Sequence, residues 1–275
     1  MNNTNDSKLT SNSPIAFGIG RAFFYSLIAV FTLQILGAVI QFPAFFYPIL
    51  NHVLLPFGFG LGLFAAIGIL LGTLRTNSQF IIQDFKTKVS ITEIILSVVI
   101  WISFLPLCEF LTTLIPTDGV LSDLYKNFET SFTMLLNYKV AGFIMVCILA
   151  PLLEEVLFRG IILKGMLNYK VNPVLAILIS AIIFGMAHLN PWQFVGAVLL
   201  GCIFGFVYYR TKSLVLPVAL HALNNLLSYT LMMQSNSMEE SVFDTSDFIS
   251  ISIFTLFALV FCFILYRITH KKINL

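Results

Sequence analysis

Three short polar patterns interrupt long apolar segments of the chain, and all contain side chains suited to hydrolysis. They are Glu154-Glu155-x-x-x-Arg159, Phe184-x-x-x-His188 and His221-x-x-x-Asn225. Carboxylates and imidazoles can move protons, and imidazoles and amides can donate hydrogen bonds to a developing oxyanion. Ionisable side chains in membrane-like surroundings are costly and by default indicate a functional site. These patterns are therefore the first candidates for a catalytic centre.

The first pattern contains two carboxylates in different helical positions. Residues four apart share a helix face, so Glu155 can pair with Arg159. Glu154 lies about 100° away on a helix of 3.6 residues per turn. We therefore predict that Glu155 is paired and supports the site, while Glu154 is free to act. The alternative is a plain salt-bridge cluster near the cytoplasmic edge.

The other two patterns each place a histidine on a helix face. His188 shares its face with Phe184, and His221 shares its face with Asn225, while Asn224 points elsewhere. Taken alone, His188 fits a packing role, and His221 with Asn225 fits a polar clamp between helices. Three helices that each offer one polar face to a shared interior instead predict an intramembrane site.

Two carboxylates, two histidines and an amide suit the hydrolysis of an amide bond. A carboxylate can take a proton from water while a histidine orients that water. No serine or cysteine accompanies these residues in a nucleophile motif, so a covalent intermediate is not expected. The alternative is a zinc ion held by Glu154, His188 and His221, with a position left for water. The metal-free reaction is favoured because the HExxH pairing is absent and the amide of Asn225 would be an unusual zinc ligand.

The elements that position these residues are predicted to be membrane helices. Hydrophobic residues make up 58% of the 275 residues, and charged residues make up only 10%. Soluble domains carry roughly 25% charged residues. The composition therefore predicts an all-α integral membrane protein, a bundle of about eight transmembrane helices in a lipid bilayer. A net charge of +2 is too small to suggest a nucleic-acid partner.

Apolar runs of about 20 residues define the predicted spans. They are 21–41, 53–73, 91–115, 140–158, 174–189, 193–209, 214–232 and 248–267. The fourth span is expected to extend to about residue 167, and the 116–139 loop to hold a short amphipathic helix. The chain then divides into a polar tail (1–20), a single transmembrane domain (21–267) with the motifs in 135–229, and a basic cytoplasmic tail (268–275).

The basic residues predict the orientation in the membrane. Lysine and arginine concentrate in cytoplasmic loops. With both termini in the cytoplasm, only Lys126 and Lys139 of the 15 basic residues fall on the outer side. The last outer loop is acidic instead, with Glu239, Glu240, Asp244 and Asp247. This division supports an even number of spans with both chain ends inside.

Several other residues near the spans have no expected catalytic role. His52 is placed in a loop, His270 in the basic tail, and Pro43 just after the first span. Glu109, near the outer end of the third span, is expected to reach the membrane interface with its carboxylate. Isolated buried thiols are expected at Cys108, Cys147, Cys202 and Cys262.

The three patterns, in this order, resemble the motifs of one family of membrane proteases. These are the CAAX prenyl proteases of the Rce1 type and their bacterial relatives, called CPBP or Abi intramembrane proteases. The resemblance covers about 135–229 and implies an eight-helix bundle whose site opens towards the cytoplasm. It implies that Glu154 is the general base, that His188 helps to activate water, and that His221 and Asn225 form the oxyanion site. Glu155 and Arg159 would then support the site.

The resemblance and the residues together predict an intramembrane endopeptidase that cleaves membrane-associated peptides or proteins. The short loops resemble the bacterial branch, which places the protein as a multi-pass protein of a bacterial plasma membrane. Members of the family are commonly labelled metalloproteases, so zinc remains the alternative cofactor. A second alternative is a non-catalytic bacteriocin-immunity or scaffold protein. A proton-coupled transporter is disfavoured because the inverted repeat expected of many transporters is missing.

Overall fold

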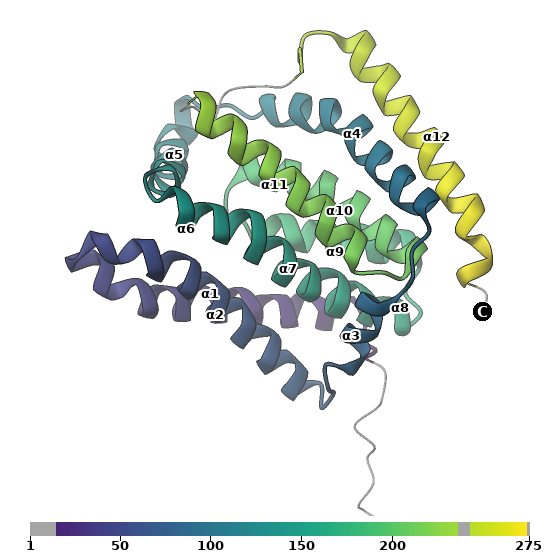
Figure 1. Cartoon of the computed structure of the whole chain (residues 1–275), viewed down its shortest axis with the longest axis horizontal. Helices are drawn as coiled ribbons and strands as arrows, with labels where there is room; N and C mark the ends of the chain where they lie inside the picture. The colour runs from purple at the N-terminus through teal and green to yellow at the C-terminus, as the bar shows by residue number, and fades with distance from the viewer. Residues whose placement is uncertain (1–14, 236–242, 274–275) are drawn as a thin grey trace, which may run out of the picture.

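A computed structural model describes residues 15–235 and 243–273, and the elements in these two ranges are all helices (Figure 1). Six long helices have simple boundaries: α1 (Ile19–Phe46), α2 (Asn51–Thr73), α4 (Ile91–Thr113), α10 (Pro191–Thr211), α11 (Val215–Ser235) and α12 (Phe248–Ile273). A seventh long segment, Lys139–Asn168, carries the first motif. The predicted all-helical membrane fold is confirmed.

The described residues contain seven helices long and apolar enough to cross a membrane. The predicted fifth span is α9 (Pro173–Met186), which is apolar but has only 14 residues. At 1.5 Å per residue it is about 21 Å long, less than the roughly 30 Å hydrocarbon core. Because α9 is so short, the residues that follow its end remain close to the interior of the bundle.

The segment Lys139–Asn168 is not a uniform α-helix. It runs through α6 (Lys139–Phe143), η3 (Ile144–Leu149), α7 (Ala150–Glu155), η4 (Val156–Leu163) and α8 (Lys164–Asn168). Both η3 and η4 are π-helical, a wider turn that often occurs at functional sites. The two glutamates of the first motif end α7, directly between these wide turns. The predicted continuation to about residue 167 is confirmed.

The short elements are α3 (Gln79–Lys86), α5 (Ser122–Asn137), and the 3-10 turns η1 (Pro48–Leu50) and η2 (Gly119–Leu121). The helix α5 confirms the one expected in the 116–139 loop, whereas α3 was not predicted. Asparagine followed by proline begins both α9 and α10, because the asparagine side chain caps the first free N–H groups.

Some boundaries differ from the prediction. Pro43 lies inside α1, and His52 lies in the first turn of α2 with its ring 4.8 Å from that of Tyr138. The packed part begins earlier than the predicted tail boundary, since Ile15 and Phe17 are buried against α8 and its neighbours. At the other end, α12 continues past the expected end of the span to Ile273. The remaining tail residues 1–14 and Glu239 and Glu240 lie outside the described ranges.

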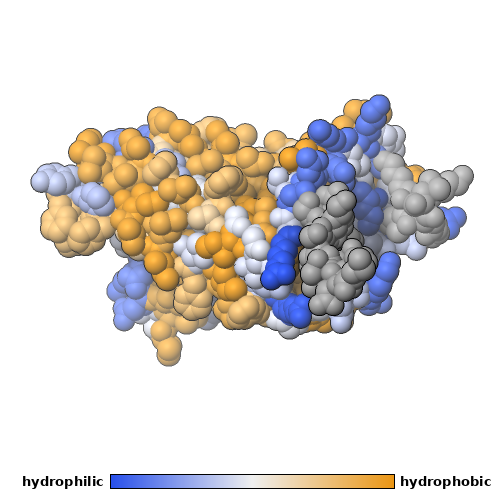
Figure 2. All heavy atoms as spheres, turned by 90° about the horizontal axis from the view of Figure 1, so that it is seen from below, coloured by the Kyte–Doolittle hydropathy of each residue, from blue (hydrophilic) through white to orange (hydrophobic). Residues whose placement is uncertain are grey.

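The outer surface is apolar over most of its length. Exposed large hydrophobic side chains cover α1, the start of α2 and α12. Figure 2 shows the face on the side of α1 and α2, where orange atoms fill the left and middle of the molecule and hydrophilic atoms gather toward the end where α3 and α8 lie in Figure 1. An apolar belt of this kind suits contact with lipid. It confirms a multi-pass membrane protein.

Candidate active site

Glu155 and Arg159 form a fully buried ion pair. Arg159 Nη1 lies 2.8 Å from Glu155 Oε1, and both side chains have 0% exposure. Arg159 Nη2 also donates to the carbonyl oxygen of Gly201 at 3.1 Å, and the guanidinium lies 4.6 Å from the centre of the Phe184 ring. The predicted pairing is confirmed. A buried pair of this kind is held by geometry and by further hydrogen bonds.

Gly201 on α10 makes this arrangement possible. A Cβ atom at position 201 would lie 3.1 Å from the Cα atom of Ala181 on α9 and 3.3 Å from Arg159 Nη2. Either contact is tighter than ordinary van der Waals packing. The glycine therefore lets α9 and α10 approach closely and leaves its carbonyl within reach of the arginine.

His221 connects the two glutamates. Its Nδ1 atom lies 3.0 Å from Glu155 Oε1, and its Nε2 atom lies 3.9 Å from Glu154 Oε2. Because a carboxylate paired with arginine only accepts hydrogen bonds, Nδ1 carries the hydrogen and donates it. The ring also stacks on Phe204, with 5.5 Å between the centres. Nε2 therefore faces Glu154 in a fixed orientation.

His188 is held by a hydrogen bond to the last turn of α9, the helix that it follows. Its Nδ1 atom lies 3.0 Å from the carbonyl oxygen of Phe184. Because a carbonyl oxygen can only accept a hydrogen bond, Nδ1 is the donor. In the neutral ring Nε2 is then an acceptor. The following residue, Leu189, has a backbone φ of 58°, a left-handed conformation that residues other than glycine rarely adopt. Asn190 Nδ2 then donates to the carbonyl of His188 at 3.0 Å. This turn fixes His188 just beyond the end of α9.

Asn225 reaches across to the widened part of the motif helix. Its Nδ2 atom donates to the carbonyl of Val146 in η3 at 2.8 Å. A primary amide has a second N–H, which suits donation to a ligand. Asn224 was predicted to point elsewhere, but it lines the same cavity. Its Oδ1 accepts from Trp101 Nε1 at 3.3 Å, and its Nδ2 donates to Asn225 Oδ1 at 3.5 Å.

One large cavity collects the predicted catalytic residues. Its volume is about 1420 Å³, and its lining includes Glu154, His188, His221 and Asn225. Glu155 and Arg159 lie behind this lining. The two adjacent glutamates are thus separated as predicted, because Glu154 lines the cavity and Glu155 is buried behind the lining.

Glu109 lies on the same cavity. Its carboxylate accepts from the backbone N–H of Phe243 at 3.1 Å. The carboxylate therefore turns toward the cavity and the α11–α12 connection. A helical position next to apolar residues gives no sign of which way the side chain turns, because that depends on how α4 packs.

The predicted zinc alternative finds little support in the arrangement of side chains. Within residues 15–235 and 243–273, no three His, Cys, Asp or Glu side chains come together as a group that could hold a metal ion. Glu154, His188 and His221 therefore share the cavity without forming such a group. The four cysteines are free thiols, and only Cys108 lies on this cavity.

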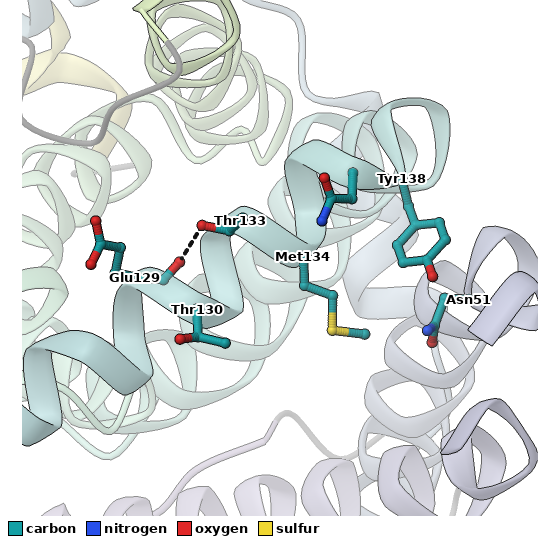
Figure 3. A pocket seen from close by; sticks show the side chains of 7 residues that line it. Asn51, Glu129, Thr130, Thr133, Met134 and Tyr138 are labelled. Carbon is teal, nitrogen blue, oxygen red and sulfur yellow. Dashed lines mark hydrogen bonds between the residues drawn. The ribbon is translucent and has the colours of Figure 1, made fainter. Parts of the chain in front are cut away.

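A second hollow has no connection with the motifs. It has a volume of about 470 Å³ and lies beside α5 and the start of α2 (Figure 3). Its lining consists of Asn51, Glu129, Thr130, Thr133, Met134, Asn137 and Tyr138. Figure 3 shows these side chains mostly along one surface of α5, without an arrangement suited to hydrolysis.

The sequence did not reveal a second buried polar cluster. Asp84 on α3 accepts from Lys164 Nζ and from Tyr208 Oη, both at 2.7 Å. Lys164 also donates to the carbonyl of Phe80 at 3.0 Å. None of these residues lines the large cavity. In the sequence, only the isolated Lys164 at the end of the motif helix could have indicated this cluster. Its partner Asp84 lies on α3, a helix that was not predicted.

The fold and the site together define a polytopic helical membrane protein with glutamate, histidine and asparagine side chains around one internal cavity. The resemblance to CAAX proteases is confirmed for the part of the chain that carries all three motifs. Residues 136–227 match the family described as Type II CAAX prenyl endopeptidase Rce1-like.

Two curated relatives each match about a third of the chain. YdiL of Bacillus subtilis, provisionally named a membrane peptidase, is 38% identical over 87 residues, which is 32% of this chain and 34% of YdiL. The membrane-embedded CAAX protease MroQ of Staphylococcus aureus is 36% identical over 104 residues, 35% of this chain and 42% of MroQ. The chain thus matches less than half the length of these relatives. No solved structure matches the chain.

Proposed function

We propose that this protein is an intramembrane endopeptidase that hydrolyses peptide bonds of membrane-associated peptides or proteins. The observation that carries the proposal is the joint placement of Glu154, His188, His221 and Asn225 on one cavity inside an apolar bundle. The name of MroQ, a membrane-embedded CAAX protease, supports the same activity class. A cavity of about 1420 Å³ is large enough for several residues of an extended peptide.

In this proposal Glu154 is the general base. Its carboxylate takes a proton from a water molecule, and the water oxygen bonds to the carbonyl carbon of the scissile peptide. His188 accepts a hydrogen bond from the same water through Nε2, since its Nδ1 is committed to Phe184. When the C–N bond breaks, the proton held by Glu154 passes to the departing nitrogen. The reaction needs no covalent enzyme intermediate.

The oxyanion is stabilised by Asn225 and His221. The second N–H of the Asn225 amide is the simpler donor. His221 can donate through Nε2 only as an imidazolium, because its Nδ1 hydrogen already points to Glu155.

Glu155 and Arg159 act as positioning residues. Arg159 fixes the Glu155 carboxylate, and Glu155 in turn fixes the tautomer and the orientation of His221. Neither residue lies on the cavity. A carboxylate behind a histidine is a common means of holding an imidazole for catalysis.

The test is cleavage by the purified protein in proteoliposomes, given a defined mixture of synthetic apolar peptides and analysed by mass spectrometry. The native protein should yield products that the Glu154→Gln variant does not. Glu129→Gln, an exposed carboxylate on α5, is the matched control and should cleave normally. Peptides that stay intact would favour the immunity or scaffold alternative. Equal cleavage by the Glu154→Gln variant would contradict Glu154 as the general base.

Chelation separates the metal-free reaction from the zinc alternative. Treatment with a zinc chelator should leave cleavage unchanged. Loss of cleavage that added zinc restores would instead assign a metal to Glu154, His188 and His221.

A further inference from the structure

We propose that the active-site cavity is loaded from the end of the molecule where α5 lies, and that this end faces the extracytoplasmic side. The inference rests on the proposed peptidase function for what enters the cavity. The direction of entry itself rests on the shape of the cavity and on the charges at the two ends of the bundle.

The cavity reaches only one end of the bundle. From the site it extends along the second half of α1, the first half of α2, the last turns of α4 and the second half of α11. It also contacts the α4–α5 connection at 115–118, one side of α5, and the α9–α10 turn at 187–193. In Figure 1 these segments meet at the end where α5 lies. No residue of α3 or α8, at the opposite end, lines it.

The opposite end is closed by a tightly packed floor. Just beyond Glu155 and Arg159, the residues Ile161, Ile162 and Leu163 have 0% exposure. Phe204 and Leu157, which line the cavity, are also almost completely buried. A peptide that approached from the α3 end would have to pass through this floor.

The charges place the open end outside the cell. Basic residues in the connections at the closed end include Arg75, Lys86, Lys88, Lys170 and Lys212. The described part of the open end is mainly acidic, with Asp118, Asp123, Glu129, Asp244 and Asp247 against the basic residues Lys126 and Lys139. The positive-inside rule therefore puts the closed end in the cytoplasm. This differs from the cytoplasmic opening that the family resemblance implies.

The lining indicates what kind of peptide enters. Its walls are largely apolar and aromatic, with Tyr125, Phe128 and Trp192 packed against one another near α5. Among the described residues, the charged members of the lining are Glu109, Asp118 and Glu154, and none is a lysine or arginine. The substrate is therefore an apolar segment with a basic flank, such as a secreted peptide or the outer part of a membrane-anchored one.

Cysteine labelling in intact bacteria tests the direction of entry without requiring catalysis. Ser131→Cys places a thiol on the cavity side of α5, and Ser78→Cys places one at the start of α3. Both serines are exposed, so they form a matched pair. A membrane-impermeant maleimide should label Ser131→Cys in intact cells and Ser78→Cys only after permeabilisation. The native chain, with its four cysteines, is the blank.

The reverse labelling pattern, or labelling of both positions only after permeabilisation, would overturn the proposal. Either result would leave the peptidase activity itself untouched. Conversely, a chain that proves inactive on peptides still gives a clear labelling result.

Cleavage of paired peptides tests the charge of the substrate. Two apolar peptides that differ only in a lysine or a glutamate flank are compared in proteoliposomes. The lysine peptide should be cleaved faster by about twofold to fivefold, as expected for one exposed charge pair, and Asp118→Asn should reduce this preference. Equal rates, or a preference for glutamate, would contradict the basic flank.

Discussion

Two buried polar clusters in this chain have similar chemistry and different surroundings. One joins Asp84, Lys164 and Tyr208 near the closed end of the bundle, where the groups bind one another outside the lining of the large cavity. The other joins Glu155, Arg159 and His221 but continues through Glu154, His188 and Asn225 onto a cavity of about 1420 Å³.

A buried charge in a membrane bundle therefore does not by itself indicate catalysis. In the first cluster the charges connect α3, α8 and α10 and are neutralised by each other. In the second cluster Glu155 and Arg159 neutralise each other in the same way, whereas Glu154 faces space that a substrate can fill. We expect substitutions to separate the two clusters, because one set changes folding and the other changes cleavage.

The largest effect is expected at Glu154. Glu154→Gln keeps the size of the side chain but removes the base, so cleavage should fall by about a hundredfold to ten-thousandfold. Peptide cleavage in proteoliposomes measures this, with the unfolding midpoint in detergent as the control. Asp84→Asn is the counterpart in the other cluster and should lower the midpoint while the folded fraction cleaves normally. The same loss of cleavage, or the same loss of stability, in both variants would contradict the separate roles of the two clusters.

Arg159→Met should affect stability more than any other single change in the second cluster. It leaves the Glu155 carboxylate buried without its partner, at a cost of about 3–5 kcal/mol. Unfolding titrations in mixed micelles measure the loss. Adding Glu155→Gln should recover much of it, because the uncompensated charge is then gone. No recovery in the double variant would contradict the ion-pair interpretation.

Asn225→Leu should reduce cleavage by about a hundredfold to a thousandfold, the usual effect of losing one oxyanion donor. The decrease should appear mainly in kcat, because the donor acts on the charge that develops in the transition state. The bond from Asn225 to Val146 also contributes to packing. Thr230→Val, on the same helix but exposed and outside the cavity lining, is the control and should retain its kcat.

The smallest effect is expected in the first cluster. Tyr208→Phe removes one hydrogen bond to Asp84 while the bond from Lys164 remains, so the unfolding free energy should fall by about 1–2 kcal/mol. Cleavage per folded molecule should not change. A loss of cleavage at constant stability would show that the first cluster also serves the site.

Local spacing was enough to predict much of this molecule. Apolar runs predicted the long helices, and the four-residue spacing of Glu155 and Arg159 predicted their ion pair. Both patterns depend only on residues that are close in the sequence. The bond between His221 and Glu155 joins residues 66 positions apart and depends on how α11 crosses the motif helix. The contact of Asp84 with Tyr208 and the inward turn of Glu109 depend on packing in the same way.

Catalysis by Glu154 is tested most directly by comparing membrane-associated and secreted peptides from three otherwise identical bacterial strains. One produces the native chain, one the Glu154→Ala variant and one the Asp84→Asn variant, each at matched levels in the membrane. We predict that specific peptide fragments disappear, and longer precursors accumulate, only in the Glu154→Ala strain. Unchanged peptides in the Glu154→Ala strain would contradict the account.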